Sequence, residues 1–394
     1  MNQVLVASQR EEKPYRQLVE QFGSPLLVLD CEVLRQRYRE LKTALNGVDL
    51  FYAIKSLPAL PALKTLAREG AGFDVATSGE LELLRRIHAD PAATIHTHPI
   101  KRDQDIRDAL DFGCSTFVVD NTDELLKFKP YASQVEILLR VSFRSKDARV
   151  DLSRKFGCGL QRVPHLLAQA ANFGICIRGL SFHVGSQSLS SAAHVHAIQA
   201  CRSFYTDPDL PGAGQLTVLD IGGGFPVDYS RQGFDLGMFC QPITTALQEY
   251  PAHVRIIAEP GRVLSAPAMT SISTVMGRAE RDGLSWYYLD DGVYGAYSGQ
   301  IYDHAHYPLT VFSDVSLTQP SVLAGPTCDS IDVITELALL PPMNIGDIVV
   351  GEQMGAYTLA TASEFNSIPK PRLVTINHDA PAAATVRLSA GTLA

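Results

Sequence analysis

The chain has 394 residues, of which 46% are hydrophobic and 19% are charged, so it can bury a large core. Its formal net charge of −8 argues against a nucleic acid or an anionic membrane as partner, because an acidic surface attracts neither. The length suits a barrel of about 250 residues plus a second domain of about 150. We therefore expect two domains and a small-molecule ligand.

The first 13 residues contain no apolar segment of a secretion signal, and no uninterrupted apolar run is long enough to span a bilayer. The seven cysteines are widely spaced and include no C-x-x-C motif, a pattern typical of reduced thiols. These features predict a cytoplasmic protein with no membrane partner.

The first apolar run, at 26–29, shows no sign of a helix before it and is expected to pair with a later β domain. From about residue 50, short β-branched and aromatic runs alternate with helical stretches, as in parallel βαβ units. Eight runs are predicted as strands, at 50–54, 72–75, 95–98, 117–120, 137–141, 180–184, 218–221 and 256–259. One intervening helix, at 78–88, has Ser78 as its expected N-cap. Eight such units predict an α/β fold with a (β/α)8 TIM-type barrel.

After about residue 264 the chain changes to short strands with frequent Gly and Pro turns, for example at 285–290 and 348–350. This pattern is typical of a mostly antiparallel β-sandwich or β-barrel. The predicted barrel covers 30–264, and the predicted β domain combines 1–29 with 265–394.

Polar and glycine residues lie in or just after the carboxyl ends of the predicted barrel strands, where the active site of such a barrel lies. They are Lys55, Asp74, Arg140, His183, Gly222, Gly223, Gly224, Glu259, Gly261 and Arg262. The Gly-rich turn after strand seven and the Gly-Arg pair after strand eight are suited to a phosphate, through backbone N–H groups and a guanidinium. A dinucleotide fingerprint is the weaker interpretation, because a third glycine is missing and Pro226 interrupts the helix start.

Lys55 and Glu259 can be given distinct chemical roles. A desolvated strand-end amine is suited to form an imine with an aldehyde, and a carboxyl group can keep a pyridine nitrogen protonated. Either residue alone has an ordinary explanation, as a surface lysine or the start of a helix. Together with the phosphate turn, they predict a pyridoxal 5′-phosphate enzyme with Lys55 as its Schiff-base lysine.

Seven ordered motifs carry a resemblance to a known family: FYAIKS (51–56), FDVATSGE (73–80), FHVGSQ (182–187), LDIGGGFP (219–226), EPGR (259–262), GPTCDSID (325–332) and MGAY (354–357). They resemble the ornithine/diaminopimelate/arginine decarboxylases, which are fold-type III, alanine-racemase-like pyridoxal-phosphate enzymes. Segments 152–157 and 291–306 resemble the bacterial ornithine and lysine decarboxylases more than the diaminopimelate branch.

The resemblance implies a role for each matching residue. Lys55 holds the cofactor, Glu259 partners the pyridine nitrogen, and His183 stacks on the ring. The phosphate is held by Ser186, Gly222, Gly223, Gly224, Gly261, Arg262 and Tyr357, and the surrounding polar shell consists of Asp74, Glu80 and Arg140. One departure is His98, which stands where relatives usually have asparagine.

The resemblance also implies a homodimer with shared active sites. Cys328, donated by the second subunit, returns a proton to the substrate carbon, and a thiol with an ordinary pKa of about 8.5 is suited to this. The implied substrate-binding residues are Tyr302, Asp303 and Asp329, with Asp329 also from the partner. A cysteine alone is usually a small buried hydrophobe, but the polar loop around Cys328 favours a functional role.

Three His-x-His pairs, at 96/98, 194/196 and 304/306, raise the alternative of a metal site. No third ligand with metal-site spacing accompanies any of the pairs, so we predict that no metal is bound.

The predicted reaction is decarboxylation of a basic L-amino acid, L-ornithine or L-lysine, to putrescine or cadaverine in polyamine biosynthesis. Two alternatives share the fold: decarboxylation of meso-diaminopimelate, or of a carboxylated polyamine such as carboxynorspermidine, where an arginine is expected in place of Asp303. An inactive, antizyme-inhibitor-like binding protein is the non-enzyme alternative. The sequence leaves the choice between ornithine and lysine open, because one methylene changes binding by only about 1–3 kcal/mol.

Overall fold

The computed structural model describes residues 4–143, 148–150, 154–210 and 215–378. The chain divides into two compact units. The first, called here the β unit, comprises Met1–Leu34, Val227–Gly233 and Leu264–Ala394. The second, the barrel unit, comprises Arg35–Pro226 and Phe234–Val263.

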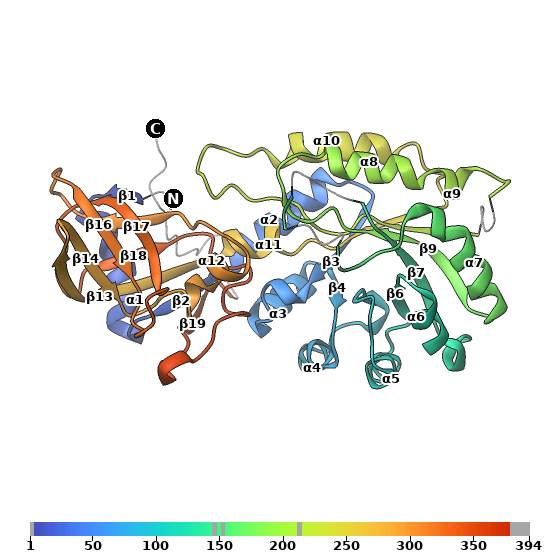
Figure 1. The fold of residues 1–394 in the computed structure, drawn as a ribbon, viewed down its shortest axis with the longest axis horizontal. Coiled ribbons are helices and arrows are strands. Elements are labelled where there is room, and N and C mark those ends of the chain that lie inside the picture. The colour runs from blue at the N-terminus through green and yellow to red at the C-terminus, as the bar shows by residue number, and fades with distance from the viewer. Residues whose placement is uncertain (1–3, 144–147, 151–153, 211–214, 379–394) are drawn as a thin grey trace. The chain divides into compact units, whose positions relative to one another are not determined.

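Eight parallel strands form a closed barrel in the barrel unit (Figure 1). In spatial order they are β11 (Val218–Asp220), β12 (Arg255–Ala258), β3 (Val48–Ala53), β4 (Gly72–Val75), β5 (Thr94–His96), β6 (Thr116–Val119), β7 (Glu136–Val141) and β9 (Cys176–Phe182). Each predicted run overlaps one of these strands, so the predicted β/α barrel is confirmed. A short antiparallel pair, β8 (Ala148–Val150) and β10 (Ser186–Ser188), lies outside this ring.

The largest difference from the predicted strands is at β9, which begins at Cys176 instead of residue 180. Arg178 and Gly179 interrupt the apolar pattern at its start. Gly179 is needed there because a Cβ at this position would lie 1.7 Å from the Val218 carbonyl oxygen of β11. The close approach of β9 and β11 therefore explains why a glycine, which usually weakens a strand, stands within β9.

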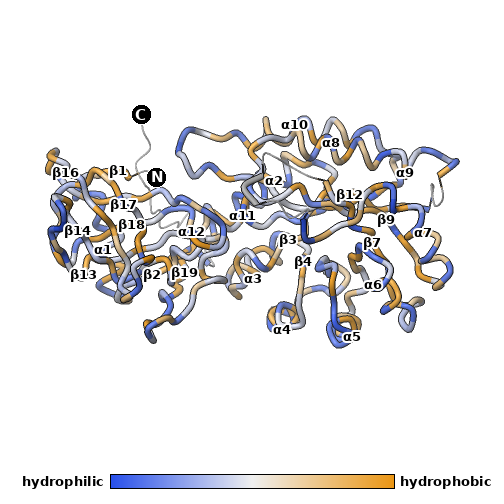
Figure 2. The backbone as a smooth tube through the Cα atoms, viewed as in Figure 1, coloured by the Kyte–Doolittle hydropathy of each residue, from blue (hydrophilic) through white to orange (hydrophobic). Residues whose placement is uncertain are grey.

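The helices are α1 (Lys13–Phe22), α2 (Cys31–Ala44), α3 (Leu60–Arg68), α4 (Ser78–Ile87), α5 (Asp103–Phe112), α6 (Thr122–Lys127), α7 (Val163–Asn172), α8 (Ala192–Cys201), α9 (Ser203–Thr206), α10 (Leu236–Leu247), α11 (Arg262–Ser265) and α12 (Gly299–Tyr302). In the described part of the chain, none of them is both long and apolar enough to cross a bilayer. Hydrophilic and hydrophobic stretches alternate along α4 and α5 (Figure 2), as expected for helices with one buried face.

The predicted N-cap of α4 was wrong by one residue. Thr77 caps the helix, and its side chain accepts a hydrogen bond from the Glu80 N–H at 3.3 Å. Ser78 is the first helical residue, and its hydroxyl donates to Asp105 of α5 at 3.1 Å. Both hydroxyl residues suit an N-cap, so the sequence alone does not distinguish them.

The core of the barrel unit includes a buried cluster with one residue from each of five barrel strands: Phe51, Ile95, Val118, Leu138 and Ile257. This packed interior leaves the polar strand-end residues as the candidates for chemistry.

The β unit contains a nine-stranded sheet that mixes both strand directions (Figure 1). Its strands are β1 (Val4–Ala7), β2 (Leu26–Asp30), β13 (Met269–Arg281), β14 (Leu284–Leu289), β15 (Leu309–Phe312), β16 (Gln319–Ala324), β17 (Val333–Leu340), β18 (Ile348–Gly351) and β19 (Arg372–Ile376). Five of the pairings between these strands are antiparallel and three are parallel. The sheet is thus mostly antiparallel, as predicted.

The predicted pairing of the first apolar run is confirmed, because β2 pairs with β13 and β19. The prediction that no helix precedes this run was wrong, because α1 ends just before β2. Its Tyr15, Leu18, Val19 and Phe22 pack on the core of the β unit. Their i, i+3, i+4, i+7 spacing is a helical signal that the sequence interpretation missed.

Candidate active site

Lys55 lies directly after β3, in a 3-10 turn at Ile54–Ser56. Its Nζ donates to Oδ2 of Asp74 at 2.8 Å, and the Thr97 hydroxyl donates to the other oxygen of this carboxylate. The Asp74 side chain is 1% exposed, whereas that of Lys55 is 42% exposed. The amine is therefore fixed at a strand end and still open to a ligand.

Glu80 adds a second carboxyl group near this pair. Its Oε2 accepts from the Ala76 N–H at 2.5 Å, and burial is the main cause that raises the pKa of Glu80. The charges of Asp74 and Lys55 act on it in opposite directions. Asp74, Glu80 and Lys55 thus form one electrostatically linked group.

Glu259 follows β12 and is buried. Its carboxyl group is hydrogen-bonded to that of Asp220, and Asp220 also accepts from the Ser181 hydroxyl at 3.0 Å and the Gly222 N–H at 2.9 Å. Burial, followed by the charges of Asp220 and Asp74, raises the pKa of Glu259 well above its ordinary value. Because Asp220 accepts from the other donors, we place the shared proton on Glu259.

Asp220 was not among the predicted site residues, although a signal for it existed. It is the last residue of β11 and precedes the Gly-rich turn, so the rule that strand ends carry the chemistry includes it. The sequence does not show that Asp220 is completely buried, so its role as the partner of Glu259 becomes clear only in the structure.

His183 follows β9, and its Nδ1 accepts from the Gly185 N–H at 3.0 Å. Burial, then the charges of Arg140 and Lys55, lower the pKa of His183 well below its ordinary value. The ring is therefore neutral at pH 7, with its proton on Nε2. A neutral flat ring is suited to stack on another aromatic ring.

Arg140 lies in β7 with its guanidinium 5.4 Å from the centre of the Phe156 ring. The His98 ring makes an edge-to-face contact with the same ring at a centroid distance of 5.4 Å. The histidine that departs from the family pattern thus belongs to an aromatic wall next to Arg140.

The turn at Gly222–Gly224 has the shape of a phosphate cradle. Gly222 and Gly224 have φ values of +65° and +97°, which favour glycine. A Cβ on Gly223 would lie 2.6 Å from the Glu259 carbonyl oxygen and 3.2 Å from Nε2 of His183. Among the described residues, no protein acceptor takes the N–H groups of Gly223 and Gly224. Two backbone donors are thus left for an anionic ligand.

Three further predicted phosphate residues, Ser186, Gly261 and Arg262, belong to the same barrel unit. The Arg262 guanidinium donates to the Ser186 hydroxyl at 3.1 Å. Gly261 is packed against the lysine turn, since a Cβ there would lie 3.1 Å from the Cβ of Ser56. These residues would suit a phosphorylated aldehyde, because the glycine turn and Arg262 offer donors to a phosphate and Lys55 offers an amine.

The barrel unit therefore holds twelve of the predicted residues: Lys55, Asp74, Glu80, Arg140, His183, Ser186, Gly222, Gly223, Gly224, Glu259, Gly261 and Arg262. The β unit holds the others: Tyr302, Asp303, Cys328, Asp329 and Tyr357.

In the β unit, Cys328 is exposed and its N–H donates to Oδ1 of Asn366 at 3.1 Å. Asp329 accepts from the Tyr294 hydroxyl at 2.6 Å, and this bond is the main cause that lowers the pKa of Asp329. Asp329 is therefore charged at neutral pH. Asp303 follows α12 and is buried, whereas Tyr302 is exposed.

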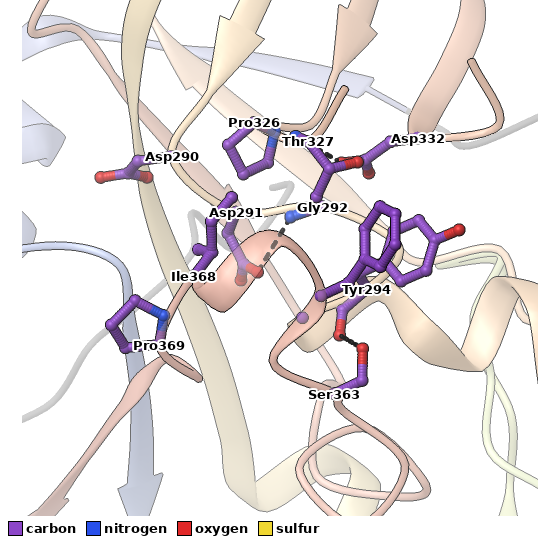
Figure 3. Close-up of a pocket in the computed structure, with 12 residues that line it drawn as sticks. Asp290, Asp291, Gly292, Tyr294, Pro326, Thr327, Asp332, Ser363, Ile368 and Pro369 are labelled. Atoms are coloured by element: carbon purple, nitrogen blue, oxygen red, sulfur yellow. Dashed lines mark hydrogen bonds between the residues drawn. The ribbon is translucent and has the colours of Figure 1, made fainter. Parts of the chain in front are cut away.

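A small recess of about 20 Å³, with room for roughly one water molecule, is lined in part by Pro326, Thr327 and Asp332 of the loop that carries Cys328 (Figure 3). Asp332 anchors the loop, because it accepts from the Thr327 N–H at 3.0 Å and from the Thr327 hydroxyl at 2.7 Å. Asp291 also lines the recess, and its Oδ2 is buried without a hydrogen-bond partner. Burial is the main cause that raises the pKa of Asp291 to about 7.

The His-x-His pairs do not form a metal centre in the described residues, where no group of three or more His, Cys, Asp or Glu side chains could hold an ion. Burial lowers the pKa of His96 to about 3, and its ring packs on Phe117 at a centroid distance of 5.7 Å. This ring is thus part of the barrel packing.

The chain matches known proteins in sequence and in structure. Residues 31–266 match the family model "Pyridoxal-dependent decarboxylase, pyridoxal binding domain". The lysine/ornithine decarboxylase of Selenomonas ruminantium is 35% identical over 356 residues, which are 90% of each chain. The solved lysine/ornithine decarboxylase of Vibrio vulnificus complexed with putrescine is 51% identical with a TM-score of 0.89, and the match covers 95% of this chain and 100% of that one. Its complex with cadaverine gives 50% identity and a TM-score of 0.90, with 94% and 100% covered. The chain therefore belongs to the family of pyridoxal-dependent decarboxylases.

Proposed function

We propose that this enzyme decarboxylates L-ornithine and L-lysine to putrescine and cadaverine, with pyridoxal 5′-phosphate as its cofactor. The observation that carries the proposal is the strand-end lysine held by Asp74 beside the buried acid Glu259 and the glycine cradle. The Vibrio vulnificus relatives, solved with putrescine and with cadaverine, support the substrate class. The intact set of Lys55, Asp74 and Glu259 argues against an inactive, antizyme-inhibitor-like protein.

When bound, pyridoxal phosphate supplies an aldehyde for the amine and a ring that accepts the electron pair left on the substrate carbon when carbon dioxide departs. The N–H groups of Gly223 and Gly224, the hydroxyl of Ser186 and the guanidinium of Arg262 hold the phosphate. Tyr357 of the β unit is proposed to join them. Lys55 provides the amine, and its pairing with Asp74 sets the position of Nζ.

Glu259 holds a proton at its carboxyl oxygen because burial and Asp220 both oppose its ionisation. That proton is available to a pyridine nitrogen, which becomes a stronger electron acceptor when it is protonated. His183, neutral and flat, is proposed to cover one face of the ring. Cys328 then returns a proton from Sγ to the substrate carbon that lost its carboxylate.

Recognition of the distal ammonium is assigned to Asp303 and Asp329, with Tyr302 beside Asp303. Asp329 is suited to this because its lowered pKa keeps it charged. A carboxylate that binds an ammonium contributes more than a neutral acceptor. Arginine in place of Asp303 would instead have favoured a substrate with a distal carboxylate.

The proposed function is tested by measuring carbon dioxide release and kcat/KM with L-ornithine, L-lysine, L-arginine and meso-diaminopimelate, with cofactor present. We expect activity with the first two and little with the others. Release of carbon dioxide only from meso-diaminopimelate, or from none of the four, would overturn the proposal.

We also propose a head-to-tail homodimer in which the β unit of one subunit completes the barrel site of the other. Cys328 is exposed, and the β unit that carries it also exposes the apolar residues Ile331, Leu337 and Leu339 by 53%, 52% and 64%. Leu337 and Leu339 are two residues apart in β17 and so share one face, and contiguous exposed apolar residues commonly mark an interaction surface. Dilution that leaves fully active monomers, detected by light scattering with activity measured on the same sample, would contradict the dimer.

A cytoplasmic location is part of the same proposal. Among the described residues, which include all seven cysteines, no disulfide is present. Reduced thiols are typical of a reducing compartment.

A further inference from the structure

The three carbonyl groups of the glycine turn are all held from the protein side. The Gly222 carbonyl accepts from the Glu259 N–H at 2.8 Å, and the Gly224 carbonyl accepts from the Ser188 N–H at 3.0 Å. The Gly223 carbonyl lies 3.0 Å from Nε2 of His194. The middle carbonyl is thus held by a side chain, whereas its neighbours are held by the backbone.

The chemistry of this contact fixes the protonation of His194. A carbonyl oxygen only accepts, so Nε2 must carry the proton and donate it. The ring is fully buried, stacks on Phe225 at a centroid distance of 5.1 Å and makes an edge-to-face contact with Phe239 at 6.1 Å. Its Nδ1 has no hydrogen-bond partner among the described residues. Burial lowers the pKa of His194 to about 4, so the ring is neutral at pH 7.

A trans peptide unit is planar, and its C=O and N–H groups point in opposite directions. The Gly223 carbonyl and the Gly224 N–H belong to one such unit. When His194 holds this carbonyl, the Gly224 N–H must point away from His194. It is one of the two cradle donors without a protein acceptor among the described residues. Because glycine is the most flexible residue, an external contact is needed to keep this orientation.

We propose that His194 is a positioning residue for the cofactor phosphate, because its Nε2–H fixes the Gly223–Gly224 peptide with the Gly224 N–H toward the bound phosphate. The inference rests on the proposed pyridoxal-phosphate function and assigns His194, on α8, a role in cofactor affinity. Together with Glu259, which fixes the Gly222–Gly223 peptide, it makes the cradle a preformed anion site.

The simpler explanation is that His194 only fills the space between two phenylalanines. The two explanations differ in which ligand is affected. A packing defect weakens the whole site, whereas a misoriented Gly224 N–H weakens only ligands that carry a phosphate. Pyridoxal, which lacks the phosphate, is therefore the discriminating probe.

The test measures Kd for pyridoxal 5′-phosphate and for pyridoxal, by absorbance titration of the full-length apoenzyme. His194→Phe keeps an aromatic ring of similar size and removes the N–H donor, and His194→Gln restores a donor at a similar distance. His196→Phe is the matched control, because His196 is an exposed histidine on the same helix. For His194→Phe we expect about a tenfold higher Kd for the phosphorylated ligand, which is typical of one lost buried hydrogen bond. Its Kd for pyridoxal should be unchanged.

His194→Gln should recover most of the affinity, and His196→Phe should match the unmodified enzyme. Equal loss for both ligands, or no loss for either, would overturn the inference. Failure of the unmodified enzyme to bind pyridoxal 5′-phosphate would instead refute the proposed function. A second measurement needs no variant: nitrogen-15 chemical shifts of the histidine ring should place the His194 proton on Nε2, and a proton on Nδ1 would exclude the donor role.

Discussion

Oδ2 of Asp74 accepts a hydrogen bond from Nζ of Lys55 at 2.8 Å, and the two residues lie near the carboxyl ends of the neighbouring strands β4 and β3. The carboxylate is almost fully buried, whereas the amine is partly open to solvent. A buried acceptor is less free to move than a surface one, so Asp74 defines where the reactive amine lies. The position of Lys55 therefore depends on the ends of two adjacent strands.

The first prediction concerns this pair. Asp74→Asn keeps the size of the side chain and removes its charge, so the amine loses a charge-assisted hydrogen bond and kcat/KM should fall about 10- to 100-fold. Thr97→Val removes only the hydroxyl that donates to Asp74 and should have a smaller effect. Steady-state kinetics with L-lysine check both variants. A larger loss in Thr97→Val than in Asp74→Asn would show that Asp74 does not act through Lys55.

The second prediction concerns the proton on Glu259. Glu259→Gln retains a donor toward Asp220 but cannot transfer a proton, so kcat should fall about 10²- to 10⁴-fold, as for other acid–base groups. The fold should be retained, because Gln fills the same space and makes the same hydrogen bond. Kinetics and the melting temperature of the apoenzyme check the two expectations. An unchanged kcat in Glu259→Gln would show that Glu259 takes no part in the chemistry.

The barrel and most of its strand ends could be predicted from the sequence, because βαβ periodicity and polar strand ends are local patterns. The structure adds contacts between residues distant in sequence. Asp220 follows the strand-end rule, but its pairing with Glu259 depends on two strands being neighbours in the closed barrel. His194 reads as half of a His-x-His pair, and its contact with Gly223 arises because α8 packs against the glycine turn. Helix α1 carries the local i, i+3, i+4, i+7 spacing of apolar residues, so it could have been predicted and was missed.

The third prediction concerns recognition of the distal ammonium. Asp329→Asn should raise KM for L-lysine and L-ornithine about 10- to 100-fold, because a charged acceptor is replaced by a neutral one. Tyr294→Phe, which removes the donor to Asp329, should have a weaker effect. Inhibition constants supply the control: cadaverine should bind Asp329→Asn more weakly, whereas pentylamine, which has only one amine, should bind both enzymes equally. Equal weakening of both amines would point to a general defect.

The fourth prediction concerns pH and the buried Asp291 (Figure 3). Its pKa is raised from 3.8 to about 7, so the folded state holds a proton that the unfolded state releases. The stability from this proton is fully present below pH 3.8 and is lost as pH rises through about 7. Asp291→Asn cannot ionise, so its melting temperature should fall less between pH 5 and pH 8 than that of the unmodified enzyme, by at least about 2–4 °C. Asp282→Asn, at an exposed turn, is the control and should leave the pH dependence unchanged. If the melting temperatures of Asp291→Asn and the unmodified enzyme fell equally with pH, the pH dependence of stability would arise from a group other than Asp291.

The last prediction tests the shared active site. Lys55→Ala removes the amine of the barrel unit, and Cys328→Ala removes the thiol of the β unit, so each variant alone should be nearly inactive. If each site combines the barrel of one subunit with the Cys328 loop of the other, a mixed dimer has one intact site and one doubly altered site. Random mixing of equal amounts should then restore roughly 25% of the activity of the unmodified enzyme. The activity should appear at the rate of subunit exchange, which native mass spectrometry can follow. No recovery after complete exchange would mean that each chain completes its own site, since a mixed dimer of such chains contains no site with both groups.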